Sequence, residues 1–140
     1  FEQYPNRILN LHIGLSPYYR GSFFKFWPIH DLRPHLLGST VHFVGKGIDD
    51  GKIVIQDTID LDENDSEFIL MVKPIILGTT LMIEAIKNTN TNLAINGKLQ
   101  DKGKLYLIKD FTSQSIFKVR SLVSSGKLKQ KIALENNKLK

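Results

Sequence analysis

The chain has 140 residues, a formal net charge of +5 at pH 7 and a hydrophobic content of 41%, which suits one domain with a buried core. It has no cysteine, so a disulfide scaffold and thiolate metal ligands are excluded and a reducing, cytoplasmic compartment is favoured. The longest uncharged apolar run, residues 74–83, is shorter than the roughly 20 residues that span a bilayer, so we expect no membrane segment.

The first predicted element is a strand over residues 8–13, where apolar and polar residues alternate. Because side chains two residues apart share one face of a strand, Asn10 and His12 are expected to point the same way. Glycine and Pro17 then predict a loop over residues 14–21. The sequence therefore predicts that an amide and an imidazole lie side by side just before a turn-rich loop.

The later elements follow from runs of apolar residues and from turn signals. In chain order we expect a short helix within residues 22–30, strands over 40–44 and 53–55 joined by a turn over 46–51, a long helix over 66–88, a strand over 104–108 and helices over 115–123 and 127–139. Ser66 is expected to cap the long helix, and Pro74 and Gly78 predict a kink or a late start. Strands that alternate with helices predict the α/β class.

Charge is unevenly distributed along the chain. Residues 57–67 are strongly acidic, whereas residues 118–140 carry an excess of lysine and arginine. The basic end suits either a surface for phosphates or nucleic acid, or a solvated helix face. We favour the solvated face, since no aromatic residues are interleaved with the basic ones, and nucleic acid is therefore not an expected partner.

No metal-binding pattern is complete. Asp60, Asp62 and Asn64 match the first ligand positions of a calcium loop, but Asp65 stands where glycine is needed. His30 and His35 lack the glutamate of a zinc protease helix. We therefore predict no metal site.

Three polar residues favour acyl-transfer chemistry. Transfer of an acyl group to an amine needs a donor for the developing oxyanion and a group that removes a proton from the nitrogen. Asn10 and His12 can donate to the oxyanion, and Asp49 can orient the imidazole or relay the proton. Taken singly, each residue also suits a turn or core position, so the prediction rests on their combination.

Four segments stand in a fixed order: Asn10-Leu11-His12, residues 16–21 (SPYYRG), residues 38–44 (GSTVHFV) and residues 47–51 (GIDDG). This order resembles the folate-dependent formyltransferase family, which shows Asn-x-His, Leu-Pro-x-x-x-Gly, Gly-Val-Thr-x-His and Gly-x-Asp-x-Gly. The resemblance covers roughly residues 6–90. Three positions depart from the family pattern: Ser16, Ser39 and Asp50.

The resemblance implies a Rossmann-like formyltransferase fold, with a mostly parallel sheet and flanking helices. Residues 1–112 would be the C-terminal half of the catalytic domain, without the N-terminal half that precedes it in the family. Residues 113–140 would form a terminal helical extension. The catalytic trio would be Asn10, His12 and Asp49, and the bond between Ser16 and Pro17 would be cis.

The implied formyl donor is 10-formyltetrahydrofolate, in contact with Val44, Gly45, Gly47 and Ile48. The implied acceptor is a small-molecule amine, and the segment from Tyr19 to Trp27 resembles members that formylate amino sugars on nucleotide carriers. We therefore predict substrate contacts at the following three residues: Tyr19, Arg20 and Trp27.

Other readings of the sequence remain open. The acceptor can instead be glycinamide ribonucleotide, or the reaction can be hydrolysis of formyltetrahydrofolate. Methionyl-tRNA formylation is disfavoured, because that branch carries a further C-terminal domain. A non-enzymatic reading is a half-domain that serves binding or dimerisation, and a homodimer is an option under either reading.

Overall fold

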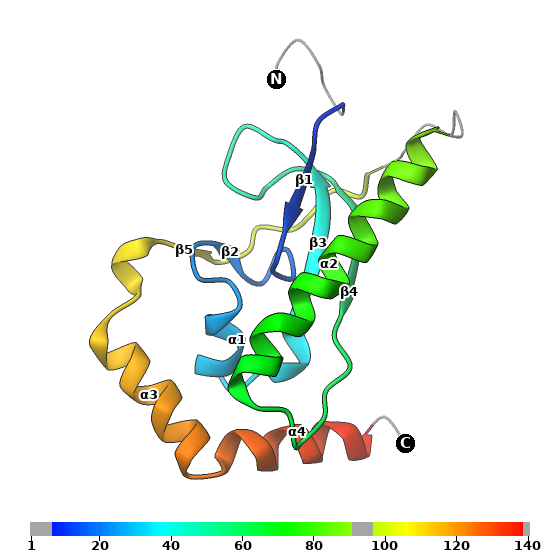
Figure 1. Cartoon of the computed structure of the whole chain (residues 1–140). Coiled ribbons are helices and arrows are strands. Elements are labelled where there is room, and N and C mark those ends of the chain that lie inside the picture. The colour runs from blue at the N-terminus through cyan, green and yellow to red at the C-terminus, as the bar shows by residue number, and fades with distance from the viewer. Residues whose placement is uncertain (1–6, 91–96, 139–140) are drawn as a thin grey trace.

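The computed structural model describes residues 7–90 and 97–138 (Figure 1). Its elements are, in chain order, β1 (Leu9–His12), β2 (Arg20–Gly21), α1 (Phe26–His30), the 3-10 turn η1 (Pro34–Leu36), β3 (Gly38–Phe43), β4 (Ile53–Thr58), α2 (Glu67–Asn90), β5 (Leu105–Tyr106), the 3-10 turn η2 (Ile108–Asp110), α3 (Ser113–Ser124) and α4 (Lys127–Lys138). Strands and helices occur together as expected, which confirms the α/β class. The predicted end of the last helix, residue 139, lies outside the described residues.

The central sheet has the strand order β1-β3-β4, and both of its pairings are antiparallel. Within the described residues, the only parallel ladder between named strands is the short one that joins β2 to β5. The expectation of a mostly parallel sheet therefore does not hold for this part of the chain. The connection between β3 and β4 explains one pairing, because a parallel pair needs a crossover of about a dozen residues or more. A shorter turn folds the two strands back on each other.

Helix α2 covers one face of this sheet and packs chiefly against β3 and β4 (Figure 1). It begins directly after Ser66, whose Oγ accepts a hydrogen bond from the Ile69 N–H, so the predicted cap is confirmed and the start is not late. Gly78 allows a close approach, since a Cβ there would lie 2.9 Å from Ile13 Cδ1 and 3.0 Å from Ser39 Oγ. Ser39 also donates to the Pro74 carbonyl at 2.5 Å, which fixes the helix on β3.

The length of α2 bears on the expectation of no membrane segment, which stays a prediction. The uncharged run over residues 74–83 is short, but the helix continues on both sides of it. Glu67–Asn88 is long and apolar enough to cross a membrane by length and composition, with a mean hydropathy of 1.8. A core helix can meet the same criterion, and only 28% of this segment is buried.

A buried hydrophobic cluster joins the two C-terminal helices to the first half of the chain. Val119 on α3 and Ile132 on α4 lie in one buried cluster with Ile29 and Leu37. Leu70 of α2 completes the contact between this cluster and the long helix. The two terminal helices form as predicted, and they share a core with the part of the chain that carries the strands.

Candidate active site

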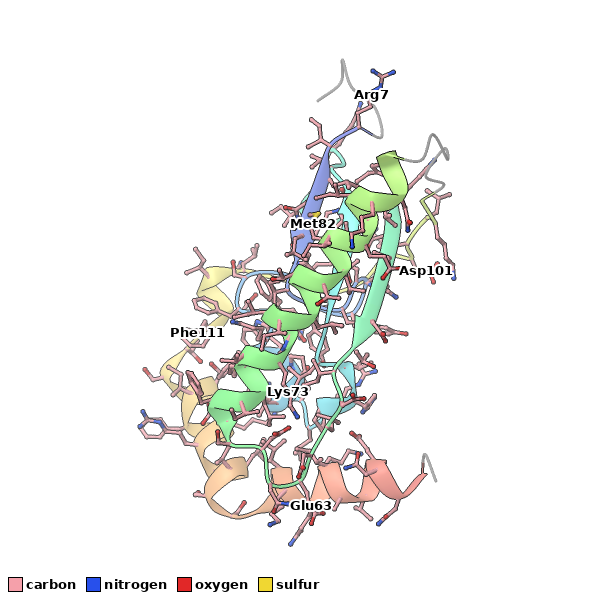
Figure 2. The ribbon with its side chains drawn as sticks, turned by 45° about the vertical axis from the view of Figure 1, so that its right-hand side comes forward. Arg7, Glu63, Lys73, Met82, Asp101 and Phe111 are labelled. Carbon is pink, nitrogen blue, oxygen red and sulfur yellow. The ribbon has the colours of Figure 1, made fainter. Side chains whose placement is uncertain are left out.

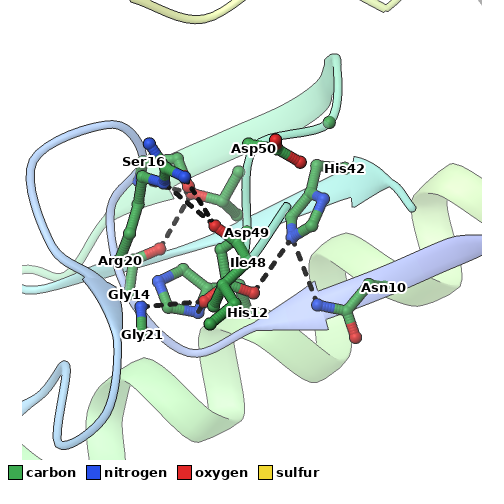
Figure 3. Close-up of polar contacts among 12 residues, drawn as sticks. Asn10, His12, Gly14, Ser16, Arg20, Gly21, His42, Ile48, Asp49 and Asp50 are labelled. Atoms are coloured by element: carbon green, nitrogen blue, oxygen red, sulfur yellow. Dashed lines mark hydrogen bonds and ion pairs between the residues drawn. The ribbon is translucent and has the colours of Figure 1, made fainter. Parts of the chain in front are cut away.

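Asn10, His12 and Asp49 come together on the sheet face opposite α2 (Figure 3). β1 pairs with β3 so that Asn10 lies across from His42 and His12 across from Thr40. Asp49 lies between two imidazoles: its Oδ2 is 3.4 Å from His12 Nδ1, and its Oδ1 is 3.6 Å from His42 Nε2. These distances are ion-pair separations, longer than good hydrogen bonds. The structure thus assembles the predicted trio and adds a second histidine.

His42 connects Asn10 to the carboxylate. Its Nδ1 is 2.8 Å from the Phe43 carbonyl oxygen, which can only accept, so Nδ1 carries a proton. In the neutral ring Nε2 then accepts from the Asn10 amide nitrogen at 3.1 Å. A primary amide has two N–H groups, so this bond leaves Asn10 one donor for a further partner.

His12 is almost fully buried, with 3% of its surface exposed. Its Nε2 donates to the Tyr19 carbonyl oxygen at 2.7 Å, and the ring of Phe24 contacts the imidazole edge to face at 4.6 Å. Nδ1 is therefore the nitrogen that faces Asp49 and the site. The contacts with Tyr19 and Phe24 orient the ring, and a positioned ring is what proton transfer by a side chain needs.

The loop between β3 and β4 presents Asp49 in an unusual backbone conformation, with φ of +48°. Such a conformation persists when surrounding contacts determine it. The Gly21 N–H donates to the carboxylate at 2.9 Å, and Gln100 donates to the carbonyl oxygens of Asp49 and Gly51 at 3.0 and 2.6 Å. Gly51 must be glycine, because a Cβ there would lie 1.6 Å from the Phe43 carbonyl oxygen.

Burial and the neighbouring charges shift the pKa values of His12, His42 and Asp49. Burial lowers the pKa of His12, although the Asp49 carboxylate and the Tyr19 carbonyl act in the opposite direction. Burial also lowers the pKa of His42, but Asp49 and the Phe43 carbonyl outweigh it and the net shift is upward. For Asp49, burial raises the pKa, while both imidazoles and the Gly21 N–H outweigh it and hold the pKa below its usual range. At neutral pH this favours an ionised Asp49 beside a neutral His12.

The residues predicted to contact the formyl donor lie in the same loop as Asp49. Gly45 is half-buried, Gly47 is exposed, and Ile48 exposes 53% of its surface. Val44 is half-buried, and its N–H donates to the Ile8 carbonyl oxygen. The loop is accessible beside the trio, and donor contact at these residues stays a prediction.

The residues predicted to contact the acceptor have different surroundings. Tyr19 is buried, and its hydroxyl donates to Asp31 at 3.4 Å. Trp27 is buried apart from an edge that lines a cleft of about 760 Å³ between α1 and α3. Arg20 donates from Nε and Nη2 to the Ile48 carbonyl oxygen at 3.1 and 2.7 Å, which ties it to the Asp49 loop. Acceptor contact at these positions stays a prediction.

The bond between Ser16 and Pro17 is cis, as the resemblance implied. Thr40 supports this loop: its hydroxyl accepts from the Ser16 N–H at 3.0 Å and donates to the Gly14 carbonyl oxygen at 2.8 Å. In residues 7–90 and 97–138, no group of three or more histidine, aspartate or glutamate side chains is arranged to hold a metal ion.

Comparison with known proteins decides the family. A family model described as "Formyl transferase" matches residues 1–86, which is more than half of the chain. The chain belongs to the formyl transferase family. Asn10, His12 and Asp49 all lie within the matched residues.

The formyl transferase relatives include proteins with different acceptors. A methionyl-tRNA formyltransferase from Caldicellulosiruptor saccharolyticus is 34% identical over 83 residues, 57% of this chain and 25% of that protein. A formyltetrahydrofolate deformylase from Escherichia coli is 30% identical over 60 residues, 43% of this chain and 21% of that protein. The chain therefore spans about a quarter of the length of these curated relatives.

A solved structure shares the fold over most of the chain. The formyltransferase PseJ from Anoxybacillus kamchatkensis, in complex with UDP-4,6-dideoxy-4-formamido-L-AltNAc and tetrahydrofolate, matches with a TM-score of 0.70 and 27% identity. The match covers 78% of this chain and 57% of PseJ. The formyltransferase fold predicted from the sequence is thus confirmed for the part of the fold that this chain contains.

Two residues that support the site were not predicted as site residues. His42 stands in the segment 38–44, and the strand alternation that places Asn10 beside His12 would also have placed His42 beside Thr40. Gln100 gives no such signal, because it lies 51 positions beyond Asp49 in a segment without a motif. Its contact with the loop follows from the fold alone.

We expect Asp49→Asn to lower the pKa of both site histidines. The carboxylate is the main contact that raises the pKa of His12, so its loss leaves burial unopposed and moves that pKa further down. The pKa of His42 should fall too, since Asp49 is what keeps it raised. Titration of the imidazole C–H signals by NMR measures both.

Asp50→Asn is the matched control for this titration. Asp50 contributes to the raised pKa of His42 and is not among the groups that shift His12. The control should therefore lower only the pKa of His42. An unchanged His12 pKa in Asp49→Asn would contradict the assigned contact.

Proposed function

We propose that this chain provides the catalytic residues of a 10-formyltetrahydrofolate-dependent N-formyltransferase. The observation that carries the proposal is the position of Asp49 between His12 and His42, with Asn10 on the same face. Membership of the formyl transferase family supports it, as does the tetrahydrofolate in the complex of PseJ. The donor would lie along the exposed loop that precedes Asp49.

In the proposed reaction the acceptor nitrogen attacks the formyl carbon. A bond forms between these two atoms, the bond from the formyl carbon to N10 of the folate breaks, and a proton moves from the amine to N10. Asn10 offers its second N–H to the oxyanion. A proton taken up from the amine by Asp49 can be shared with His12 Nδ1, 3.4 Å away, which is unprotonated in the neutral ring.

We propose an amino-sugar nucleotide as the acceptor. The cleft next to Trp27 is lined by Lys104, Lys109 and Lys118, which suits the phosphates of a nucleotide carrier. β5, which contributes to this cleft, pairs with β2, and β2 supplies the Gly21 N–H that holds Asp49. PseJ, which was solved with a UDP-linked formamido sugar, supports the same acceptor class.

Release of tetrahydrofolate should depend on the acceptor. We expect the gene product that contains this chain to release tetrahydrofolate from 10-formyltetrahydrofolate only when an amino-sugar nucleotide is added. Absorbance or mass spectrometry follows the release, and the formylated sugar is detected in the same sample. Release at the same rate without acceptor would instead favour hydrolysis, the reaction named for the Escherichia coli relative. Glycinamide ribonucleotide in place of the sugar tests the remaining alternative.

A further inference from the structure

The outer face of α2 carries an apolar stripe that includes Phe68, Ile75, Ile76 and Ile83. These residues expose 73%, 42%, 63% and 49% of their surfaces. Their spacing of seven, eight and fifteen positions places them on one side of a helix with 3.6 residues per turn. No acidic or basic side chain interrupts the stripe. Figure 2 shows α2 across the front of the molecule, with side chains that project away from the sheet.

The stripe lies opposite the face that α2 buries. Leu70, Leu81 and Ala85 pack into the core, and the helical period places them on the far side of the helix from Ile76. A helix that is apolar on both sides is expected to be buried on both sides, so the outer face requires a partner of its own.

We propose that a second copy of this chain covers the stripe, with the two α2 helices antiparallel about a two-fold axis near Ile75 and Ile76. This axis brings Phe68 of one copy to Ile83 of the other, and the two central isoleucines meet each other. These four residues are spaced evenly about the axis, so the same patch of both copies can meet, as in an isologous interface.

Charge at the ends of α2 favours the antiparallel arrangement. The segment before the helix is acidic and includes Asp62 and Glu63, whereas Lys87 stands near the other end. Antiparallel copies bring the basic end of one helix to the acidic end of the other, and the helix dipoles are aligned favourably too. A lipid surface fits less well, because helices that lie on membranes carry lysine and arginine along the borders of the apolar face. Here Glu84 and Lys73 balance each other, and Lys73 is paired with Asp65.

The size of the stripe predicts a dimer that dissociates on dilution. One helix face per copy is less than the roughly 20–30 residues and roughly 800 Å² per partner of a standard interface. Analytical ultracentrifugation of the intact chain over a range of concentrations measures the equilibrium. We expect Ile76→Glu to raise the dimer dissociation constant about 10-fold or more, because a carboxylate would be buried at the centre of the interface.

Ile108→Glu is the matched control, since Ile108 exposes 74% of its surface on η2, away from α2. It should leave the dimer intact, and circular dichroism should show the same fold in both variants. Lys87→Glu should weaken the dimer several-fold at low salt, which tests the antiparallel arrangement independently of the stripe. A wild-type chain that stays monomeric at every concentration, or a Lys87→Glu variant with unchanged dimerisation, overturns the proposal. Sedimentation of a monomeric wild type with phosphatidylcholine and phosphatidylglycerol vesicles would overturn it in favour of a membrane surface.

Discussion

Asp49→Asn and His12→Ala should each lower the kcat of formyl transfer by about 10²–10⁴-fold, the range found when a positioned proton-transfer group is removed. Asparagine has nearly the shape of aspartate but cannot take up the amine proton. The His12→Ala change removes the imidazole nitrogen that lies 3.4 Å from the carboxylate. Steady-state kinetics with 10-formyltetrahydrofolate and the amino-sugar nucleotide measure the loss, and circular dichroism checks that the fold survives.

Asp57→Asn is the matched control for the aspartate change. Asp57 is exposed on β4, where its carboxylate accepts a hydrogen bond from the Thr58 N–H, and it lies across from Ser39 of β3, not from a residue of the trio. This variant should keep wild-type kcat. Full activity in both Asp49→Asn and His12→Ala would show that the trio is wrongly assigned, whatever the protein binds.

The meeting of Asn10, His12 and Asp49 could be predicted because strand periodicity and motif order are local properties. Alternation in β1 places Asn10 and His12 on one face, and the segment 47–51 combines a turn with a carboxylate. The sequence does not reveal what holds Asp49 at a positive φ. That conformation depends on the Gly21 N–H and the Gln100 amide, which lie 28 positions before and 51 positions after it in the chain. Contacts at such separations follow from the tertiary fold and leave no periodic signal.

In the fold, too, local patterns predict the elements, whereas contacts between distant segments cannot be predicted from them. Helix α2 and the terminal helices follow from 3.6-residue periodicity and from Ser66 as a cap, so their positions were predictable. The pairing of β1 with β3 was not, because the period of a strand is the same in parallel and antiparallel sheets. Nor did apolar content distinguish the buried side of α2 from its exposed stripe, since both sides are rich in isoleucine and leucine.

Ile132→Ala should destabilise the whole chain by about 2–5 kcal/mol, a large part of the 5–15 kcal/mol that typically stabilises a domain. Ile132 is 1% exposed and lies in the cluster that joins α4 to Ile29, Leu37 and Leu70. The cavity left by alanine would therefore weaken contacts with the part of the chain that carries the site, although residues 113–140 were predicted as an extension.

Leu134→Ala on the same helix is the matched control, because Leu134 exposes 60% of its surface and should cost little. Urea unfolding, followed by far-UV circular dichroism and by the fluorescence of Trp27, tests whether residues 113–140 share the core or form a separate unit. If α3 and α4 belong to the common core, both signals shift to lower urea together in Ile132→Ala. If the tryptophan signal kept its wild-type midpoint while helix content was lost early, residues 113–140 would be a separate unit that contributes nothing to the position of the trio. The shared cluster makes a single cooperative transition the expected result, because Ile29, two residues from Trp27, contributes to the same cluster as Ile132.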